Sequence, residues 1–262
     1  MSSLWRDLAA SFRNPEFWAL SGWLDIMVRN RQSRLGVFWL LVPPIVYIWG
    51  IGGMFASMMG LSFREFVAYV ALGYVVFRLI SAVITESSGA FLSAASFILD
   101  GHLRLTDFIL RVVAKALFYF LVSLPVVAAS VYLSPDWHWQ ALPASLLALA
   151  WMTGITLCIG VVFAVVGARL PDVGQLVNNV FMFAFLLTPI IWHTDFMPAE
   201  SLRGQLVRFN PLFHMVEVVR APLLGMPVAP ESYLYLCALT VVALLGATVT
   251  YRLFARHVPV WV

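Results

Sequence analysis

Long apolar stretches separated by short polar ones dominate the pattern of hydrophobic and polar positions along this chain. Six apolar windows approach the roughly 20 residues that an α-helix needs to cross the hydrocarbon core of a bilayer. We expect these spans at Leu35–Met58, Phe66–Ile84, Val112–Tyr132, Ala141–Val166, Val173–Trp192 and Tyr233–Phe254. The pattern therefore predicts an all-α polytopic membrane protein, a single domain over residues 1–262 whose six-span core covers residues 35–254.

The segment before the first window has the pattern of an amphipathic helix. In a helix over residues 21–34, the polar side chains share one stripe and the apolar side chains face elsewhere. The stripe consists of Ser21, Asp25, Arg29 and Gln32, and the apolar residues are Leu20, Trp23, Leu24 and Met27. Such a helix suits a position flat on a bilayer surface, so we expect residues 1–34 to form an interfacial, cytoplasmic N-terminus. Residues 1–17 lack the apolar core of a cleavable signal peptide.

Positive charge is distributed unevenly around these windows. With the N-terminus in the cytoplasm, eleven Lys and Arg residues lie on that side, four lie outside and Arg78 lies within the second span. The inner set is Arg6, Arg13, Arg29, Arg31, Arg34, Arg104, Arg111, Lys115, Arg169, Arg252 and Arg256, and the outer set is Arg64, Arg203, Arg208 and Arg220. This bias predicts that both termini are cytoplasmic, with residues 255–262 as a short tail.

Two connections are too long to be simple turns. Residues 85–111 contain Asp100, His102, Arg104 and Asp107. We interpret this connection as an extension of the second span into the cytosol, followed by a short helix able to contact a cytoplasmic partner. Residues 193–231 contain two apolar pieces too short to cross a bilayer. We expect re-entrant or interfacial outer helices there, before the last span.

Composition and charge narrow the class of protein further. Hydrophobic residues make up 62% of the chain and charged residues only 11%, which excludes an ordinary soluble domain. The net charge of +3 fits a basic rim beside anionic lipid rather than nucleic-acid binding. Both cysteines, Cys158 and Cys237, lie in apolar runs, so a disulfide framework is not expected.

The sequence lacks the residues that several kinds of chemistry require. The single lysine, Lys115, follows Ala114, so no phosphate-binding loop exists and ATP hydrolysis would need another polypeptide. The five histidines are scattered without metal-ligand spacing, and no cofactor or metal site is expected in this chain. Paired carboxylates within one span are also missing. An intramembrane enzyme and an ion-coupled carrier are therefore poor fits.

Arg78 and the aromatic residues each allow two interpretations. An ionisable group in mid-span is a functional candidate, but Arg78 could instead snorkel or pair with Glu65, Glu86 or another subunit. Aromatic residues concentrate in the first and fifth windows: Phe38, Trp39, Tyr47, Trp49, Phe181, Phe183, Phe185 and Trp192. Such residues commonly pack or form an interfacial belt. The alternative is a channel lining on which the C–H faces of sugars slide.

Five motifs in order along the chain carry a family resemblance. They are Trp23–Pro44, Glu86 with Ala90–Phe91, Ala168–Asp172, Leu187–Trp192 and Asn210–Gly225. Together these motifs resemble the type-2 ABC exporter permeases for polysaccharides and polyol phosphates, and most closely those that export O-antigen. Two positions depart from that pattern. Asn30 stands where an aromatic residue is common, and Arg78 stands where a neutral residue is usual.

The resemblance implies an assembly and a substrate. It implies a homodimer of six-span subunits in the bacterial inner membrane, combined with two copies of a separate ABC ATPase subunit that holds ATP and Mg. The substrate would be a glycan on an undecaprenyl-diphosphate carrier, within a membrane of lipids. Capsular polysaccharide and teichoic-acid permeases share this architecture. A membrane scaffold or enzyme of lipid-glycan synthesis, and a secondary carrier, are the competing classes.

Site roles follow from the resemblance combined with the residues. Arg29, Arg31 and Arg34 would attract the lipid diphosphate at the inner leaflet, although arginines before a span also set topology without any substrate. Phe38, Trp39, Tyr47, Trp49, Phe181, Phe185 and Trp192 would line the glycan channel. Asp100, His102, Arg104 and Asp107 would couple to the ATPase, and Asn210, Pro211, His214, Glu217 and Arg220 would shape an outer re-entrant gate.

Overall fold

Every regular element in the described part of the chain is a helix, which confirms the all-α class. The computed structural model describes residues 3–31, 34, 36–101, 103–135, 137–194 and 201–262, without the side chains of Arg29, Asn30, Val37 and Arg203. Five helical stretches are long and apolar enough to cross a bilayer. They are Phe38–Met59, Phe63–Ser88, Leu105–Leu133, Trp139–Arg169 and Pro230–Trp261. The chain is therefore a multi-pass membrane protein.

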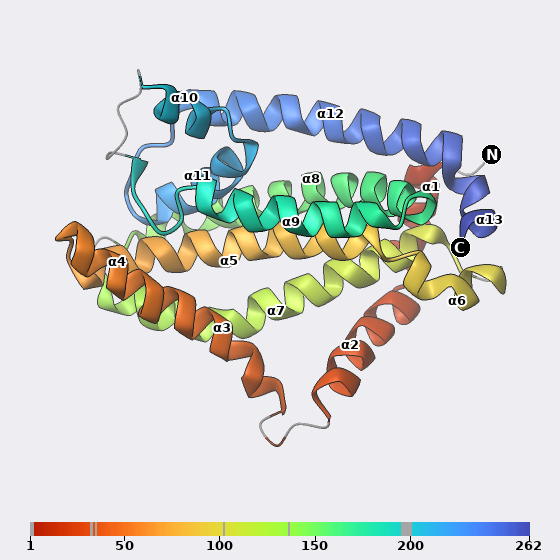
Figure 1. The fold of residues 1–262 in the computed structure, drawn as a ribbon, viewed down its shortest axis with the longest axis horizontal. Helices are drawn as coiled ribbons and strands as arrows, with labels where there is room; N and C mark the ends of the chain where they lie inside the picture. Colours follow the sequence, from red (N-terminus) through yellow and green to blue (C-terminus); the bar gives the residue numbers. More distant parts are fainter. Residues whose placement is uncertain (1–2, 32–33, 35, 102, 136, 195–200) are drawn as a thin grey trace.

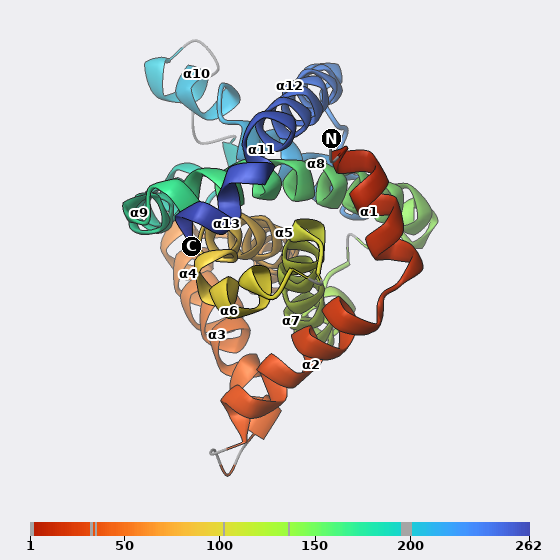
Figure 2. The same cartoon turned by 90° about the vertical axis from the view of Figure 1, so that its right-hand side faces the viewer.

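Helix α5 (Phe63–Ser88) is the central helix of the bundle (Figures 1 and 2). Its apolar residues lie on all sides of the helix. In its most hydrophobic stretch of 18 residues, 83% of the residues are buried, whereas in the corresponding stretch of the first span only 17% are buried. It packs against α7 (Leu105–Leu133) and α8 (Leu142–Arg169). Gly167 of α8 allows the closest approach, because a Cβ there would overlap the carbonyl oxygen of Ser88.

The fifth predicted window forms a shorter helix than expected. The sequence predicts a span over Val173–Trp192, but α9 covers only Asp172–Leu187, 16 residues, or about 24 Å of helix. Pro189 explains the early end, because the residue before a proline is pushed out of the helical region and Thr188 is extended, with ψ 131°. The sixth full-length span thus stays a prediction, although α9 runs alongside α5 in Figure 1.

The first span is a helix of changing pitch. It begins as a 3₁₀ segment, η1 (Gly36–Leu41), continues as α3 (Val42–Ile45), widens into the π-helical η2 (Val46–Ile51) and ends as α4 (Gly52–Met59). Pro43 and Pro44 carry no backbone N–H, which removes donors from the regular α-helical ladder at that point. Gly60, with φ +68°, ends α4 in the left-handed conformation.

Both termini lie at the same end of the bundle (Figure 1). This end carries α1 (Leu4–Arg13), η3 (Leu92–Ala94), α6 (Ala95–Leu99), η6 (Ala255–His257) and α13 (Val258–Trp261), and α2 (Glu16–Asn30) runs from it. Helix α1 connects two long helices: Ser11 is hydrogen-bonded to Thr106 of α7 at 2.7 Å, and the Tyr251 hydroxyl donates to Asp7 at 2.8 Å. Tyr251 belongs to α12 (Pro230–Phe254). The cytoplasmic location of this end stays a prediction.

The opposite end carries η4 (Trp139–Ala141), α10 (Leu202–Arg208) and α11 (Pro211–Leu223) (Figure 1). Helix α11 packs between α5, α8 and α12, and α10 lies beside it. These helices occupy the stretch where the sequence predicts outer re-entrant or interfacial helices. Their depth in a bilayer stays a prediction. On the other side of the bundle, α2 packs against α7, and α2 and the first span form the two arms of a V whose lower ends approach each other (Figure 1).

Candidate functional site

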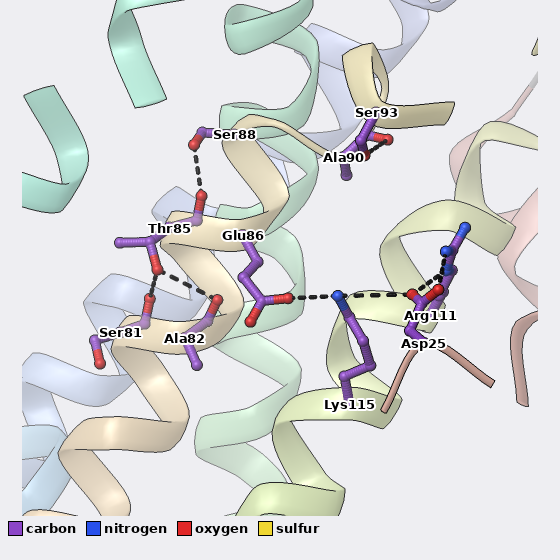
Figure 3. Close-up of polar contacts among 10 residues, drawn as sticks. All are labelled: Asp25, Ser81, Ala82, Thr85, Glu86, Ser88, Ala90, Ser93, Arg111 and Lys115. Carbon is purple, nitrogen blue, oxygen red and sulfur yellow. Dashed lines mark hydrogen bonds and ion pairs between the residues drawn. The ribbon is translucent and has the colours of Figure 1, made fainter. Parts of the chain in front are cut away.

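Four charged side chains, which we call the charged junction, join α2, α5 and α7 (Figure 3). Arg111 donates two hydrogen bonds to Asp25, from Nε to Oδ2 at 2.8 Å and from Nη2 to Oδ1 at 2.5 Å. Lys115 Nζ lies 2.7 Å from Glu86 Oε2 and 3.9 Å from Asp25 Oδ2. Two cations and two carboxylates therefore balance, and each side chain keeps between 20% and 34% exposure.

The positions of these groups follow from helix geometry. Arg111 and Lys115 are four residues apart on α7, so both side chains project from one face of that helix. Glu86 lies in the last turn of α5, opposite that face. A cavity of about 210 Å³ lies between these side chains and Ala90, Ser93, Phe108 and Val112. The junction is thus a polar, partly open space at the meeting point of three helices.

Helix α2 turns part of its polar stripe toward the protein. Gly22 and Ile26 are buried, Gly22 lies close to the Arg111 carbonyl of α7, and Asp25 faces Arg111. The apolar residues Leu20, Leu24 and Val28 are 50–67% exposed. This arrangement is physically consistent, because an exposed apolar face can contact lipid whereas the carboxylate finds its partner on α7.

Of the predicted ATPase-coupling residues, Asp107 lies about one helical turn before Arg111 of the charged junction, on the same helix α7. Asp100 and Arg104 are exposed, whereas Asp107 is buried and accepts a hydrogen bond from the Arg104 backbone N–H at 3.0 Å as part of a helix cap. His102 lies outside the described residues. The Phe17 ring of α2 lies between Phe97 of α6 and Phe108 of α7, at centroid distances of 6.0 and 5.6 Å. Helix α6 therefore contacts α2 directly.

The three arginines predicted to meet a lipid diphosphate lie where the arms of the V meet. Arg31 and Arg34 are exposed, and the Arg29 side chain is outside the described residues. Neither Arg31 nor Arg34 has a carboxylate within ion-pair distance among the described residues. Their charge is thus available to solvent or to an anionic surface.

Aromatic side chains from three helices meet in one cluster, which we call the aromatic cluster. Tyr47 of the first span stacks on Tyr74 of α5 at 5.2 Å, and its ring lies 5.6 Å from Phe185 of α9 at a steep angle. Phe77 of α5 adds edge contacts at 5.4 Å to Phe185 and 6.1 Å to Phe181. The first span and α9 are thus in direct contact through Tyr47 and Phe185, and both also pack on rings of α5.

The other aromatic residues predicted for the channel lie apart from this cluster. Phe38 and Trp39 are 71% and 50% exposed near the start of the first span. Trp49 donates its indole N–H to Ser130 of α7 at 2.9 Å, which fastens the first span to that helix. Trp192 lies beyond α9 and donates to the Leu186 carbonyl at 3.2 Å. The structure therefore brings together three of the seven predicted residues: Tyr47, Phe181 and Phe185.

Arg78 pairs with neither Glu65 nor Glu86, the two carboxylates of this chain that the sequence suggested as its partners. Its Nη1 donates to the Tyr74 hydroxyl at 2.8 Å, and its guanidinium carbon lies 6.0 Å from that ring's centroid. Glu86 pairs with Lys115 instead, and Glu65 lies in the first turn of α5, several turns away. Within the described part of the chain, no carboxylate forms an ion pair with Arg78.

Arg220 is fully buried at the end of the bundle opposite the termini. It donates to Glu217 Oε2 at 2.5 Å and to the Pro189 carbonyl at 2.8 Å, and its guanidinium lies 3.6 Å from the centroid of the Tyr69 ring. The Tyr69 hydroxyl donates to the same Pro189 carbonyl at 3.1 Å. We call these four residues the outer clasp, because they hold α11, α5 and the end of α9 together.

The remaining residues of the predicted outer gate are also tied to neighbours. Asn210 caps α11 by accepting from Leu212 N–H at 3.0 Å, and it donates to Thr188 at 2.9 Å, with Pro211 at the first helical position. His214 contacts the Arg208 carbonyl at 2.7 Å and the Ser232 hydroxyl at 2.9 Å. A carbonyl only accepts, so Nε2 carries the proton in the neutral ring. Burial lowers the pKa of His214, although the Arg208 carbonyl, Glu231 and Glu217 oppose the shift.

Sequence reasoning did not single out two parts of this arrangement. The sequence assigns Arg111 and Lys115 a role in topology, and Lys115 also excludes a phosphate-binding loop, yet their spacing of four residues at the start of a span is the signal for a paired face. Tyr74 and Phe77 were hidden in an apolar window, where spacing of three residues is also ordinary packing. No group of three or more possible metal ligands occurs in the described residues.

Comparison with known proteins gives an independent line of evidence. No family model matches the chain. Over 197 residues it is 22% identical to an O-antigen export system permease protein RfbA of Klebsiella pneumoniae, covering 73% of this chain and 74% of that protein. Over 200 residues it is 22% identical to the protein of the same name from Myxococcus xanthus, covering 75% and 76%. With the motifs along the chain, these similarities support assigning it to the family of O-antigen export permeases.

Proposed function

We propose that this chain is the transmembrane permease subunit of an ATP-driven exporter that moves a lipid-linked polysaccharide of O-antigen type across the bacterial inner membrane. The observation that carries the proposal is the match over about three quarters of the chain to proteins named O-antigen export permeases. The geometry adds a reason: a first span and a short α9 lie together on one side of the bundle and share the aromatic cluster.

The proposed assembly is a homodimer bound to two copies of a separate ATPase subunit. The ATPase would contact the end that carries both termini, where α6 presents Phe97 and Leu99 at 48% and 63% exposure beside Asp100. Exposed apolar side chains on a short polar-flanked helix are typical of a docking surface. Movement of α6 would reach α2 through the Phe17 ring and through the charged junction.

The substrate would enter beside α2 and the first span, the two arms of the V. The diphosphate of an undecaprenyl carrier would be attracted by Arg29, Arg31 and Arg34, because clustered cations at an inner leaflet bind phosphate. The glycan would then pass the aromatic cluster, whose flat apolar faces accept sugar rings without fixing one orientation. The outer clasp would hold the exit end rigid while the other end moves.

Co-purification and ATPase measurement test this proposal directly. The chain would be purified in mild detergent from the membranes of its natural host, retained proteins would be identified by mass spectrometry, and hydrolysis would be measured with and without lipid-linked O-antigen. We expect a stable complex whose hydrolysis rises with the lipid-linked glycan, while the chain alone hydrolyses nothing. Failure to retain an ATPase under these conditions would contradict the proposal.

A triple substitution separates substrate attraction from topology. Replacing Arg29, Arg31 and Arg34 by Gln should reduce export while membrane insertion and complex formation persist. Arg252→Gln, an exposed arginine near the end of α12, is the matched control and should export normally. If the triple variant exports at the normal rate, the arginines only set topology.

A further inference from the structure

Arg78 is a cation in the middle of a membrane-spanning helix. It is the sixteenth of the 26 residues of α5. An ionisable group at such a position is costly and usually faces a polar partner or a water-filled path. Its side chain is partly exposed rather than enclosed by the bundle.

The guanidinium has unused hydrogen-bonding capacity. It carries five N–H donors, and its one hydrogen bond among the described residues goes to the neutral hydroxyl of Tyr74. Tyr74 is itself stacked on Tyr47 of the first span, and Arg78 lines a small pocket of about 10 Å³ together with Tyr119 and Phe120 of α7. The charged head thus lies between three helices, beside a second polar group that can also donate.

Neighbouring cations differ from Arg78 because their charge is balanced. Arg111 and Lys115 face Asp25 and Glu86 in the charged junction. Arg78 precedes Glu86 by eight residues on α5, which corresponds to about 12 Å of helix. An anion that moves past the junction along the α5–α7 face would therefore meet Arg78 as the next positive charge, and that charge lacks a carboxylate in the described residues.

A second copy of this chain cannot easily supply the missing anion. The sequence contains thirteen carboxylate side chains. The ten in the described residues lie outside the candidate spans or within three residues of a long helix's end, with Glu65 and Glu86 at the two ends of α5. A symmetric partner would present the same distribution, so its described residues offer no mid-span carboxylate. A non-protein anion is therefore the partner that fits this position best.

We propose that Arg78, together with the Tyr74 hydroxyl, binds the phosphate of a lipid head group at the α5–α7 face. A planar guanidinium matches phosphate oxygens through two parallel hydrogen bonds, and the tyrosine hydroxyl supplies a third donor. Phosphates of resting bilayer lipids lie at the membrane surface, so a mid-span phosphate is one in transit. This inference rests on the proposed function only in that a lipid-linked cargo would bring the phosphate.

Ligand binding to the purified full-length chain tests the proposal. The chain would be held in a phosphate-free maltoside detergent and titrated separately with undecaprenyl diphosphate, phosphatidylglycerol and undecaprenol, with bound lipid counted by native mass spectrometry. Undecaprenol is the matched ligand because it shares the chain but lacks phosphate. The variants are Arg78→Gln, Arg78→Lys and the control Arg252→Gln.

We expect Arg78→Gln to weaken binding of undecaprenyl diphosphate at least about tenfold, because a charge-assisted bidentate contact is lost. Arg78→Lys should retain part of the affinity, and undecaprenol binding should not change. Phosphatidylglycerol that binds as tightly as the diphosphate, with the same dependence on Arg78, supports the same phosphate site with a bilayer lipid as its source, and weaker binding supports the carrier. Without lipid, Arg78→Gln should melt no earlier than the natural chain, because an unbalanced cation has been removed.

Three results would overturn the proposal. The first is unchanged diphosphate binding in Arg78→Gln, and the second is an equal loss of undecaprenol binding. The third is loss of the dimer or of thermal stability in that variant, since this would show that Arg78 pairs with protein. The assay uses neither ATP nor the ATPase, so a failure here with export intact rejects only this inference. Absent export with Arg78-dependent binding would reject only the proposed function.

Discussion

The charged junction and the outer clasp solve the same structural problem in different ways. Each fastens a helix to the bundle, and each contains an arginine paired with a carboxylate. In the outer clasp, Arg220 is fully buried and its carboxylate, Glu217, lies three residues away on the same helix. In the junction, Arg111 reaches Asp25 on another helix, 86 residues away in sequence, and both side chains are partly exposed around a cavity.

This difference separates a fixed contact from one that can change. A buried pair that loses one partner leaves an uncompensated charge in a low-dielectric interior, so the outer clasp has no inexpensive alternative state. A partly exposed pair can exchange its partner for water at little cost. The junction is therefore suited to a region that moves when the ATPase acts, and the clasp to a region that stays in place.

The largest expected effect comes from removing the buried cation. Arg220→Met should destabilise the protein by about 3–5 kcal/mol, because Glu217 is left unpaired and the Pro189 carbonyl loses a donor. Thermal unfolding in detergent, followed by tryptophan fluorescence, measures the change. Arg208→Met is the control: this partly exposed side chain makes one long contact, 3.5 Å to the Gly204 carbonyl, and should cost at most about 0.5 kcal/mol.

A double variant sharpens this result. Arg220→Met combined with Glu217→Leu removes both charges together, and it should recover a measurable part of the loss because no unpaired charge remains. If Arg220→Met costs no more than Arg208→Met, the outer clasp is not the rigid element of the comparison.

The next effect concerns the backbone contact beside the junction. Gly167→Ala should destabilise by about 1–3 kcal/mol, because the new methyl group overlaps the Ser88 carbonyl and must push α8 from α5. Gly154→Ala, on the same helix with nothing within 4 Å of its would-be Cβ, should be neutral or stabilise by up to about 1 kcal/mol. Equal unfolding midpoints for the two variants would show that the close packing of α8 on α5 at Gly167 contributes nothing measurable to stability.

A smaller effect is expected within the junction itself. Asp25→Asn and Arg111→Gln should each cost about 1 kcal/mol or less, because solvent screens a pair with 22–34% exposure. The double variant should cost less than the sum of the two. Hydrogen exchange should increase over residues 16–30, since α2 loses its polar contact with α7. A destabilisation as large as that of Arg220→Met would erase the distinction between the two regions.

The smallest effect is a pH dependence at the clasp end. Burial lowers the pKa of His214 below its usual 6.5, so the unfolded chain binds a proton at higher pH than the folded one. The stability that the neutral ring contributes is complete above pH 6.5 and is lost as the pH falls from there through the folded pKa. Unfolding measured at pH 7.5 and 5.5 should show a smaller pH-dependent loss in His214→Gln than in the natural chain. If both proteins lose the same stability between these pH values, the pH dependence arises from a group other than His214.

Sequence patterns predicted most of the architecture because membrane helices must satisfy their backbone internally and remain apolar over a defined length. Five of the six windows became long apolar helices. The exception depended on one residue: the apolar window continued to Trp192, but Pro189 ended α9 earlier. A pattern of apolar residues does not show that a proline keeps the residue before it out of the helical conformation.

Site prediction was limited by the lack of distance information between helices. The sequence indicated that aromatic residues of the first and fifth windows share a role, and Tyr47 and Phe185 are indeed in contact. It could not show that Tyr74 and Phe77 join the same cluster, because both lie in a uniformly apolar helix. Glu86 was considered for Arg78, but Lys115 on a neighbouring helix binds it. Such choices among partners depend on how helices rotate against each other.

The changing pitch of the first span has a consequence for how this protein can vary. A π-helical segment holds about one residue more than the α-helical turn it replaces, so η2 (Val46–Ile51) is a place where a deletion can be absorbed. Removing one residue there would restore an ordinary α-turn while the residues on either side of η2 keep their facing. The same deletion inside α4 would instead rotate everything before it by about 100° relative to the rest of the helix. A single-codon deletion in η2 would thus leave Phe38 and Trp39 facing their present surroundings.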